Sequence, residues 1–108
     1  MLTSKQLADI FDDERENGNH SDEFLKFNRI PEAERRHARR DLCGMLLLAE
    51  RMPGTRDIVQ GADHDQIWFD CKREKYDSPW PLTEEDAIYL MRCGFFWDEK
   101  NESLSSFV

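Results

Sequence analysis

"LTEEDAIYLMRCGFFWDEKNESLSSF", residues 82–107, carries the signals of one helix and of two β-strands. It opens with the start and stop signals of one helix. Thr83 is a capping residue type, Asp86 stands three positions later as a short capping box, and Gly94 follows where a left-handed backbone is wanted. Two β-runs come next, "FFWD" and "SLSSFV", joined by "EKNE", in which Asn101 can take a positive φ. The stretch predicts a helix followed by a β-hairpin.

Two further strands are expected before this helix. "DIVQ" (57–60) is a short strand candidate, "GADHD" (61–65) has the composition of a turn, and "QIWFDC" (66–71) is a better strand. "KREKYDSPWP" is a polar connection to the helix. The second half of the chain therefore predicts a β-β-α-β-β unit with a small antiparallel sheet.

The first half indicates about three helices. Thr3 or Ser4 can cap a first helix that runs to about Glu16, Ser21 can cap a short second one, and Pro31 suits the first position of a third. The third helix carries an apolar stripe at helical spacing. Its members are Ala38, Leu42, Met45, Ala49 and Met52.

Gly44 interrupts the third helix at a cost of about 1 kcal/mol in helix propensity relative to alanine. This cost predicts close packing against another element. With 108 residues there is room for one core only, so we expect a single α+β domain spanning residues 1–108.

The formal charge is −8 and is unevenly distributed. Residues 1–24 carry two basic and seven acidic side chains, residues 25–56 eight and four, and residues 57–108 five and twelve. The chain is thus acidic, basic and acidic in turn. Such a balance repels nucleic acid as a whole and favours basic protein surfaces, so we expect no direct DNA binding.

The chain shows no apolar run long enough to span a bilayer and no signal peptide pattern at its start. Cys43, Cys71 and Cys93 are odd in number and lie in apolar stretches, which indicates buried, protonated thiols in a reducing cytoplasm. There is no glycine-rich phosphate loop or cysteine pair at metal spacing, and we expect no cofactor.

The last quarter of the chain resembles small accessory proteins of tailed bacteriophages and prophages. The resemblance rests on residues 82–86, Tyr89-Leu90, residues 92–94, Asp98-Glu99 and the closing Leu104, Phe107 and Val108. It implies a virus-encoded protein in the cytoplasm of a bacterial host, directed at a host protein. It implies no catalytic residues, because most such proteins lack an assigned activity.

One enzymatic alternative is a metal-dependent nuclease of the PD-(D/E)xK kind. Asp57 would open one strand, "IWFDCK" would supply Asp70 and Lys72, and Glu50 could complete the cation site. Against it, a D-x-K tripeptide is frequent in a chain with 35% charged residues, no proline precedes Asp57, and residues 57–108 are acidic.

A metal site at Asp63, His64 and Asp65 is the weaker alternative. A single histidine without a second one, or a cysteine, at metal spacing is a poor ligand set. The favoured interpretation is a solvated turn whose aspartates hydrogen-bond their own backbone.

Four arginines, Arg35, Arg36, Arg39 and Arg40, would form one basic stripe if the third helix includes them. The stripe could bind phosphate or RNA. The favoured alternative is that it neutralises the acidic first helix within the fold.

The two aromatic strands, "IWF" and "FFW", cannot point every ring inward, because neighbouring residues of a strand face opposite ways. One face of the sheet should pack on helices, and the other needs a cover from the chain itself, a second copy or a partner. Aromatic rings surrounded by acids suit docking to a basic protein surface. The candidate interaction residues are Trp68, Phe96, Trp97, Glu84, Glu85, Asp98, Glu99 and Glu102.

The sequence therefore favours a non-enzymatic acidic protein that binds a host protein and modulates it, most simply by inhibition. A host protein whose surface normally binds nucleic acid is one candidate partner. The nuclease with Asp57, Asp70 and Lys72 is the alternative, and a homodimer that pairs through the aromatic sheet face is another.

Overall fold

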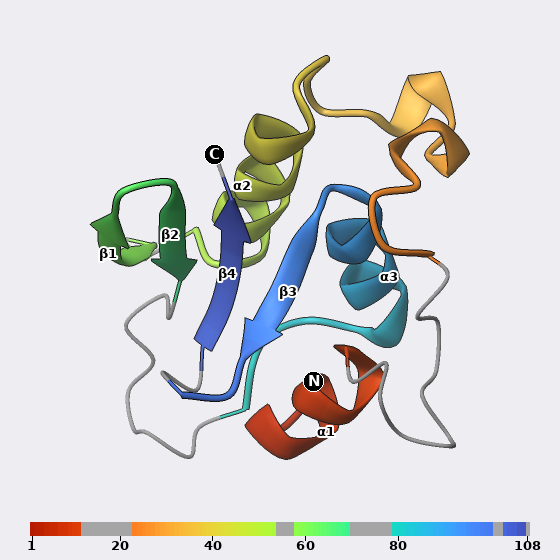
Figure 1. Ribbon diagram of the computed structural model, residues 1–108. Helices are drawn as coiled ribbons and strands as arrows, with labels where there is room; N and C mark the ends of the chain where they lie inside the picture. The colour runs from red at the N-terminus through yellow and green to blue at the C-terminus, as the bar shows by residue number, and fades with distance from the viewer. Residues whose placement is uncertain (12–22, 54–57, 70–78, 101–102, 108) are drawn as a thin grey trace.

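The computed structural model describes residues 1–11, 23–53, 58–69, 79–100 and 103–107. Three α-helices and a four-stranded antiparallel sheet with strand order β1-β2-β4-β3 make up an α+β fold, as predicted. The elements are α1 (Ser4–Phe11), α2 (Arg40–Arg51), β1 (Val59–Asp63), β2 (Gln66–Phe69), α3 (Glu84–Arg92), β3 (Phe95–Asp98) and β4 (Ser103–Phe107). Figure 1 shows α2 and α3 behind the sheet, with α1 below.

Helix α3 and the hairpin after it form as the sequence predicts. The Thr83 hydroxyl accepts the Asp86 backbone N–H at 3.1 Å, and the Asp86 carboxylate accepts the Thr83 N–H at 3.0 Å, which completes the capping box. The chain leaves the helix at Gly94, whose φ of +89° is open to glycine without strain. β3 and β4 then pair in register, with Phe96 opposite Ser105. Asn101 lies outside the described residues.

The turn between β1 and β2 is shorter than predicted. Gly61, Ala62 and Asp63 belong to β1, so only His64 and Asp65 form the turn. His64 takes a φ of +52°, as a two-residue hairpin requires of its first residue. Residues of turn-like composition therefore lie in a strand, because the pairing of Asp63 with Gln66 closes the hairpin tightly.

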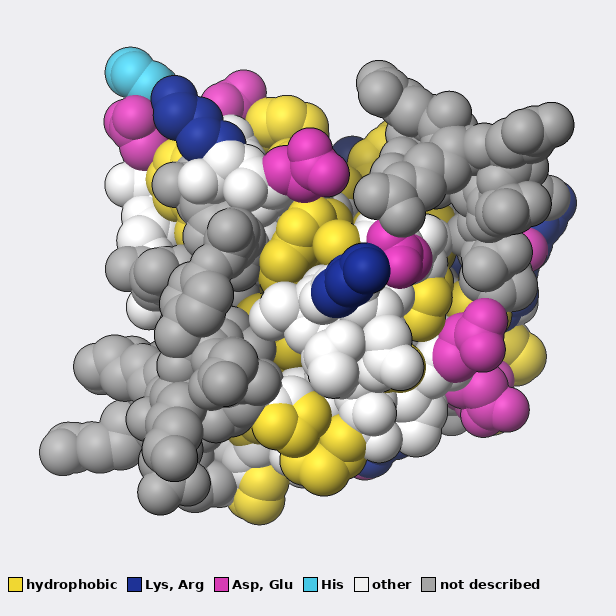
Figure 2. All heavy atoms as spheres, turned by 90° about the horizontal axis from the view of Figure 1, so that it is seen from below, with side chains coloured by type: hydrophobic (Ala, Val, Ile, Leu, Met, Phe, Trp, Pro, Cys, Tyr) yellow, Lys and Arg dark blue, Asp and Glu magenta, His cyan; other side chains and the backbone are white. Residues whose placement is uncertain are grey.

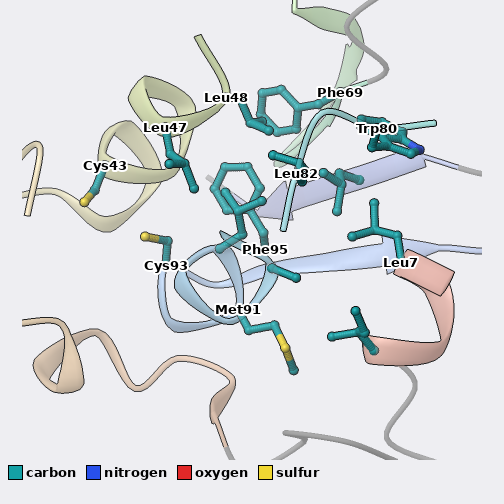
Figure 3. Close-up of a cluster of buried hydrophobic side chains, with 14 of the residues drawn as sticks. Leu7, Cys43, Leu47, Leu48, Phe69, Trp80, Leu82, Met91, Cys93 and Phe95 are labelled. Carbon is teal, nitrogen blue, oxygen red and sulfur yellow. The ribbon is translucent and has the colours of Figure 1, made fainter. Parts of the chain in front are cut away.

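The core lies between the sheet and the helices (Figure 3). Phe95 and Phe69 stack with their ring centroids 5.1 Å apart, and both are fully buried. Gly44 of α2 faces Phe95, and a methyl group at Gly44 would lie 2.7 Å from the Phe95 Cζ. The predicted close packing at Gly44 is confirmed, and it sets the distance between α2 and the sheet.

Helix α1 joins the same core from the other end of the chain. Thr3 and Gln6 form a capping box, with Thr3 N–H donating to the Gln6 side chain at 2.9 Å and Gln6 N–H to the Thr3 hydroxyl at 3.1 Å. Leu2 pairs with Trp80 in an isolated β-bridge, and the Trp80 indole N–H donates to Ser4 Oγ at 3.0 Å. The N-terminal helix is thus tied to the segment that leads into α3.

The N-terminal half differs from the prediction in two respects. The chain from residue 27 to 34 forms two short 3₁₀ helices, Phe27–Arg29 and Glu32–Glu34, and α2 begins only at Arg40. The predicted apolar stripe is right only in part: Met52 is buried and Leu42 and Met45 are half-buried, but Ala38 and Ala49 are exposed. The buried face of α2 consists of Cys43, Gly44, Leu47 and Leu48. A helix that is apolar nearly all round does not indicate its own buried face.

Candidate docking surface

The face of the sheet turned away from α2 and α3 is the candidate site, and we call it the outer face. The pairings of β2 with β4 and of β3 with β4 place seven side chains on it. No described helix covers it (Figure 1). These residues are Gln66, Trp68, Phe96, Asp98, Ser103, Ser105 and Phe107, of which the two serines are fully buried.

Asp98 organises one end of the outer face. One of its carboxylate oxygens accepts the Trp68 indole N–H at 2.6 Å and the Gln66 amide N–H at 3.3 Å. The same amide group donates to Ser105 Oγ at 2.7 Å, and that hydroxyl donates to the Ile67 carbonyl at 3.0 Å. Because each ring or amide has a fixed hydrogen-bond partner, this half of the face is held in one conformation.

Phenyl rings form the other end of the outer face. Phe96 and Phe107 are in contact, with ring centroids 4.9 Å apart. Phe107 is 56% exposed, although phenylalanine is a residue type that folding usually hides. The outer face therefore carries a strip of aromatic side chains that reaches solvent at Phe107.

The structure brings together only part of the predicted interaction set. Trp68, Phe96 and Asp98 share the outer face, and exposed Glu99 follows Asp98 directly. Trp97 points the opposite way, into the core, where its ring meets Trp80 edge-on at 6.0 Å.

The remaining predicted acids do not belong to the outer face. Glu84 and Glu85 are exposed in the first turn of α3, which packs behind the sheet, and Glu102 lies outside the described residues. Sequence reasoning missed Gln66 and Phe107. Their signal was the two-residue alternation along β2 and β4, which becomes usable only when the strand pairing is known.

The nuclease alternative falls on residues that the structure does not describe, since Asp57, Asp70 and Lys72 all lie in undescribed segments. Glu50, its fourth member, is paired with arginines in α2 and the chain before it. The nuclease stays a prediction.

Asp63 at the end of β1 and the turn residues His64 and Asp65 are exposed, and His64 Nε2 lies 3.5 Å from an Asp63 carboxylate oxygen. Within the described ranges, no three His, Cys, Asp or Glu side chains gather closely enough to hold a metal ion. None of the helices described is both long and apolar enough to cross a bilayer.

The predicted basic stripe does not exist as a helix face. Arg35, Arg36 and Arg39 precede α2, and only Arg40 belongs to it. Arg39 pairs with Asp41, with its Nη2 2.9 Å from a carboxylate oxygen. Arg35 and Arg36 line one hollow and Arg39 and Arg40 line another, so the four side chains do not form one stripe.

Arg36 lines a hollow of about 540 Å³ that lies between α2, α3 and residues 33–36. Its guanidinium donates to Glu50 at 2.7 Å and lies 4.9 Å from the centre of the Tyr89 ring. The hydrogen bond from Arg36 holds the pKa of Glu50 below its usual range. Arg51 makes a two-pronged contact with Asp86 in the same hollow, at 3.1 and 3.2 Å. Arg36 and Arg51 are thus paired with Glu50 and Asp86 inside the fold, and most acids of the predicted first helix, residues 12–16, lie outside the described residues.

Cys43 and Cys93 are free, buried thiols whose sulfur atoms face one another across the α2–α3 contact (Figure 3). Burial raises the pKa of Cys93. Burial also acts to raise the pKa of Cys43, but it is outweighed by a hydrogen bond with the Tyr89 hydroxyl, 2.9 Å away, and by backbone N–H groups, so the pKa is lowered. The expectation that burial alone keeps the thiols inert describes Cys93 better than Cys43, and Cys71 is not described.

The acidic side chains do not merge into one DNA-like surface on the face shown in Figure 2. Among the residues coloured there, the acids form separate groups divided by hydrophobic, basic and uncharged side chains. No family model, curated protein or solved structure matches this chain. Its function must be argued from its own surface.

Proposed function

We propose that this protein is a non-enzymatic acidic protein that binds a basic surface of another protein through its outer face. The observation that carries the proposal is the aromatic strip of Trp68, Phe96 and Phe107, which reaches solvent on a face that no described helix covers. Large aromatic side chains on rigid strands are the usual anchors of protein interfaces, because little conformational entropy is lost when they bind.

The net negative charge of the protein favours a partner with a basic surface. The chain carries a net −8, and exposed acids lie at both ends of the outer face: Asp63 and Asp65 at the β1–β2 turn, Glu99 after β3. A basic surface approaches such a protein faster than a neutral one does, and the advantage falls as salt screens the charges.

The resemblance of residues 82–108 to phage accessory proteins supports a bacterial host protein as the partner. A host protein that grips nucleic acid has the basic surface that this proposal requires. Binding to that surface would inhibit it by occupying the place of the nucleic acid.

The test begins with capture on the tagged protein from nuclease-treated bacterial lysate, and the bound protein is identified by mass spectrometry. The purified partner is then titrated with the wild type, with Phe107→Ala and with Leu46→Ala. Leu46 is the matched control, because it is 43% exposed on α2, away from the outer face.

We expect Phe107→Ala to weaken binding about tenfold or more, as loss of an aromatic anchor does. Leu46→Ala should bind as the wild type does, and the affinity of both should fall with added salt. A partner that binds Phe107→Ala as tightly as the wild type, or whose affinity ignores salt, would overturn the proposal.

A further inference from the structure

At one end of the outer face lies a cavity. Its lining carries an uncompensated positive charge, whereas the exposed charges at the ends of the outer face are negative. Next to Phe107, at the carboxyl end of β4, lies a hollow of about 390 Å³. It is walled by the start of α2 and by the 3₁₀ helix at residues 27–29, and it continues the aromatic strip, because Phe107 also touches Phe96. The residues that line it are Phe27, Ala38, Arg39, Arg40, Asp41 and Phe107.

The charges in this cavity leave one positive charge uncompensated. The charges of Arg39 and Asp41 compensate each other, because the Arg39 guanidinium donates to the two Asp41 carboxylate oxygens at 3.2 and 2.9 Å. Arg40 is exposed, and its guanidinium makes no hydrogen bond or ion pair with any residue that the structure describes. One arginine is therefore free to bind one anionic group from outside.

Apolar walls flank this arginine. The Phe107 ring is 56% exposed, and the Phe27 ring carries the Arg35 guanidinium 5.0 Å from its centre. A charge-assisted hydrogen bond beside apolar surface is stronger than one in open water, since less solvent competes for it.

We infer that this cavity binds a single carboxylate, the side chain of a glutamate or aspartate in the partner segment that lies on the outer face. The guanidinium of Arg40 donates two hydrogen bonds to it, a geometry that arginine and carboxylate share. An apolar side chain next to that acid packs on Phe107. The inference rests on the proposed function and adds one acidic residue to an otherwise basic partner.

A nucleic acid is the poorer occupant. Its phosphates need several arginines or lysines in a row, whereas this cavity offers one. Asp41 inside it, together with Asp63 and Asp65 at the β1–β2 turn, adds to the repulsion that a chain of net −8 exerts on a polyanion.

The experiment uses two fluorescein-labelled peptides, Lys-Lys-Leu-Glu-Leu-Lys-Lys and the same peptide with Gln in place of Glu, titrated by anisotropy. We expect the wild type to prefer the Glu peptide by about tenfold or more, the worth of one charged hydrogen bond. Arg40→Gln should lose the preference and bind the Gln peptide as before. Lys100→Gln, which removes the same charge after β3, should keep it.

Equal binding of both peptides by the wild type, or binding of neither, would overturn the carboxylate site. So would a single-stranded oligonucleotide that binds with the same dependence on Arg40. If capture of a salt-sensitive partner still depends on Phe107 in that case, the proposed function stands without the site. If the peptide preference holds but no partner depends on Phe107, the proposed function fails and the site remains.

Discussion

Gly44 fixes how closely α2 approaches the sheet. The Phe95 ring occupies the space where any other residue would place a Cβ atom. Glycine lowers the helix propensity of α2 at this position. In return, the complete Phe95 ring is buried, which contributes about 1.5 to 3 kcal/mol to stability.

Gly44→Ala should therefore lower the free energy of unfolding. Overpacking against Phe95 costs about 1 to 3 kcal/mol, while alanine returns about 1 kcal/mol of helix propensity. Urea unfolding followed by tryptophan fluorescence measures the net loss. Phe95→Leu supplies the control background, since Gly44→Ala should no longer destabilise when the ring is gone. The same loss in both backgrounds would contradict the assignment of the clash to Phe95.

At the scale of the elements, α3 carries its own boundaries and α2 does not. The capping box of Thr83 and Asp86 and the glycine at position 94 are local signals that act as predicted, and the acids of the first turn favour the helix as well. The start of α2 depends instead on distant groups. Arg36 N–H donates to the Tyr89 hydroxyl at 3.4 Å, and the Tyr89 hydroxyl donates to the Glu34 carbonyl at 3.0 Å.

Asp86 links the cap of α3 to Arg51 of α2, and its effect on stability should depend on pH. Burial acts to raise the pKa of Asp86, but hydrogen bonds from Arg51 and from the Thr83 backbone prevail, so the pKa lies below its ordinary value. A carboxyl group with a depressed folded pKa stabilises above its unfolded pKa, about 4, and loses this effect as the pH falls through the folded pKa.

Asp86→Asn should accordingly be less stable than the wild type by about 1 to 2 kcal/mol at pH 7, the worth of a charged cap. The gap should shrink as the pH falls below about 4. Chemical unfolding at a series of pH values measures it, with Glu85→Gln as the control, because Glu85 is exposed in the same turn. If the difference in stability between the wild type and Asp86→Asn stays constant from pH 7 to pH 3, the negative charge of Asp86 does not stabilise the fold.

At the scale of the whole molecule, the outer face could be covered by a second copy as well as by another protein. Each copy carries −8, so two copies repel one another as they approach. A basic partner is attracted under the same conditions. The electrostatic balance therefore favours a hetero-complex over a homodimer.

We expect a monomer of 12.8 kDa by light scattering at low micromolar concentration and about 0.15 M salt, a concentration at which charges are screened beyond about 8 Å. The same measurement at higher salt tests whether repulsion alone prevents pairing. Twice that mass at low salt would favour the homodimer, and Phe107→Ala should then return it to a monomer.

Strand geometry explains why only part of the candidate site could be predicted from the sequence. The aromatic runs "IWF" and "FFW" require two apolar faces, but not which ring belongs to which face. The register of β4 decided that Trp97 meets Trp80 in the core while Trp68 and Phe96 face outward. Arg40 was predicted as part of a stripe, and its separation from Arg36 came only with the late start of α2.

Local sequence signals were sufficient to predict the α+β class, the order of the elements in the second half, the caps of α3 and the close packing at Gly44. Each of these depends on residues within a few positions of one another, or on a steric demand that any partner would meet. The buried face of α2, its first residue, the strand order and the composition of the outer face became known only from the three-dimensional structure. These depend on contacts between residues dozens of positions apart, such as Tyr89 with Glu34, whose energies no local pattern records.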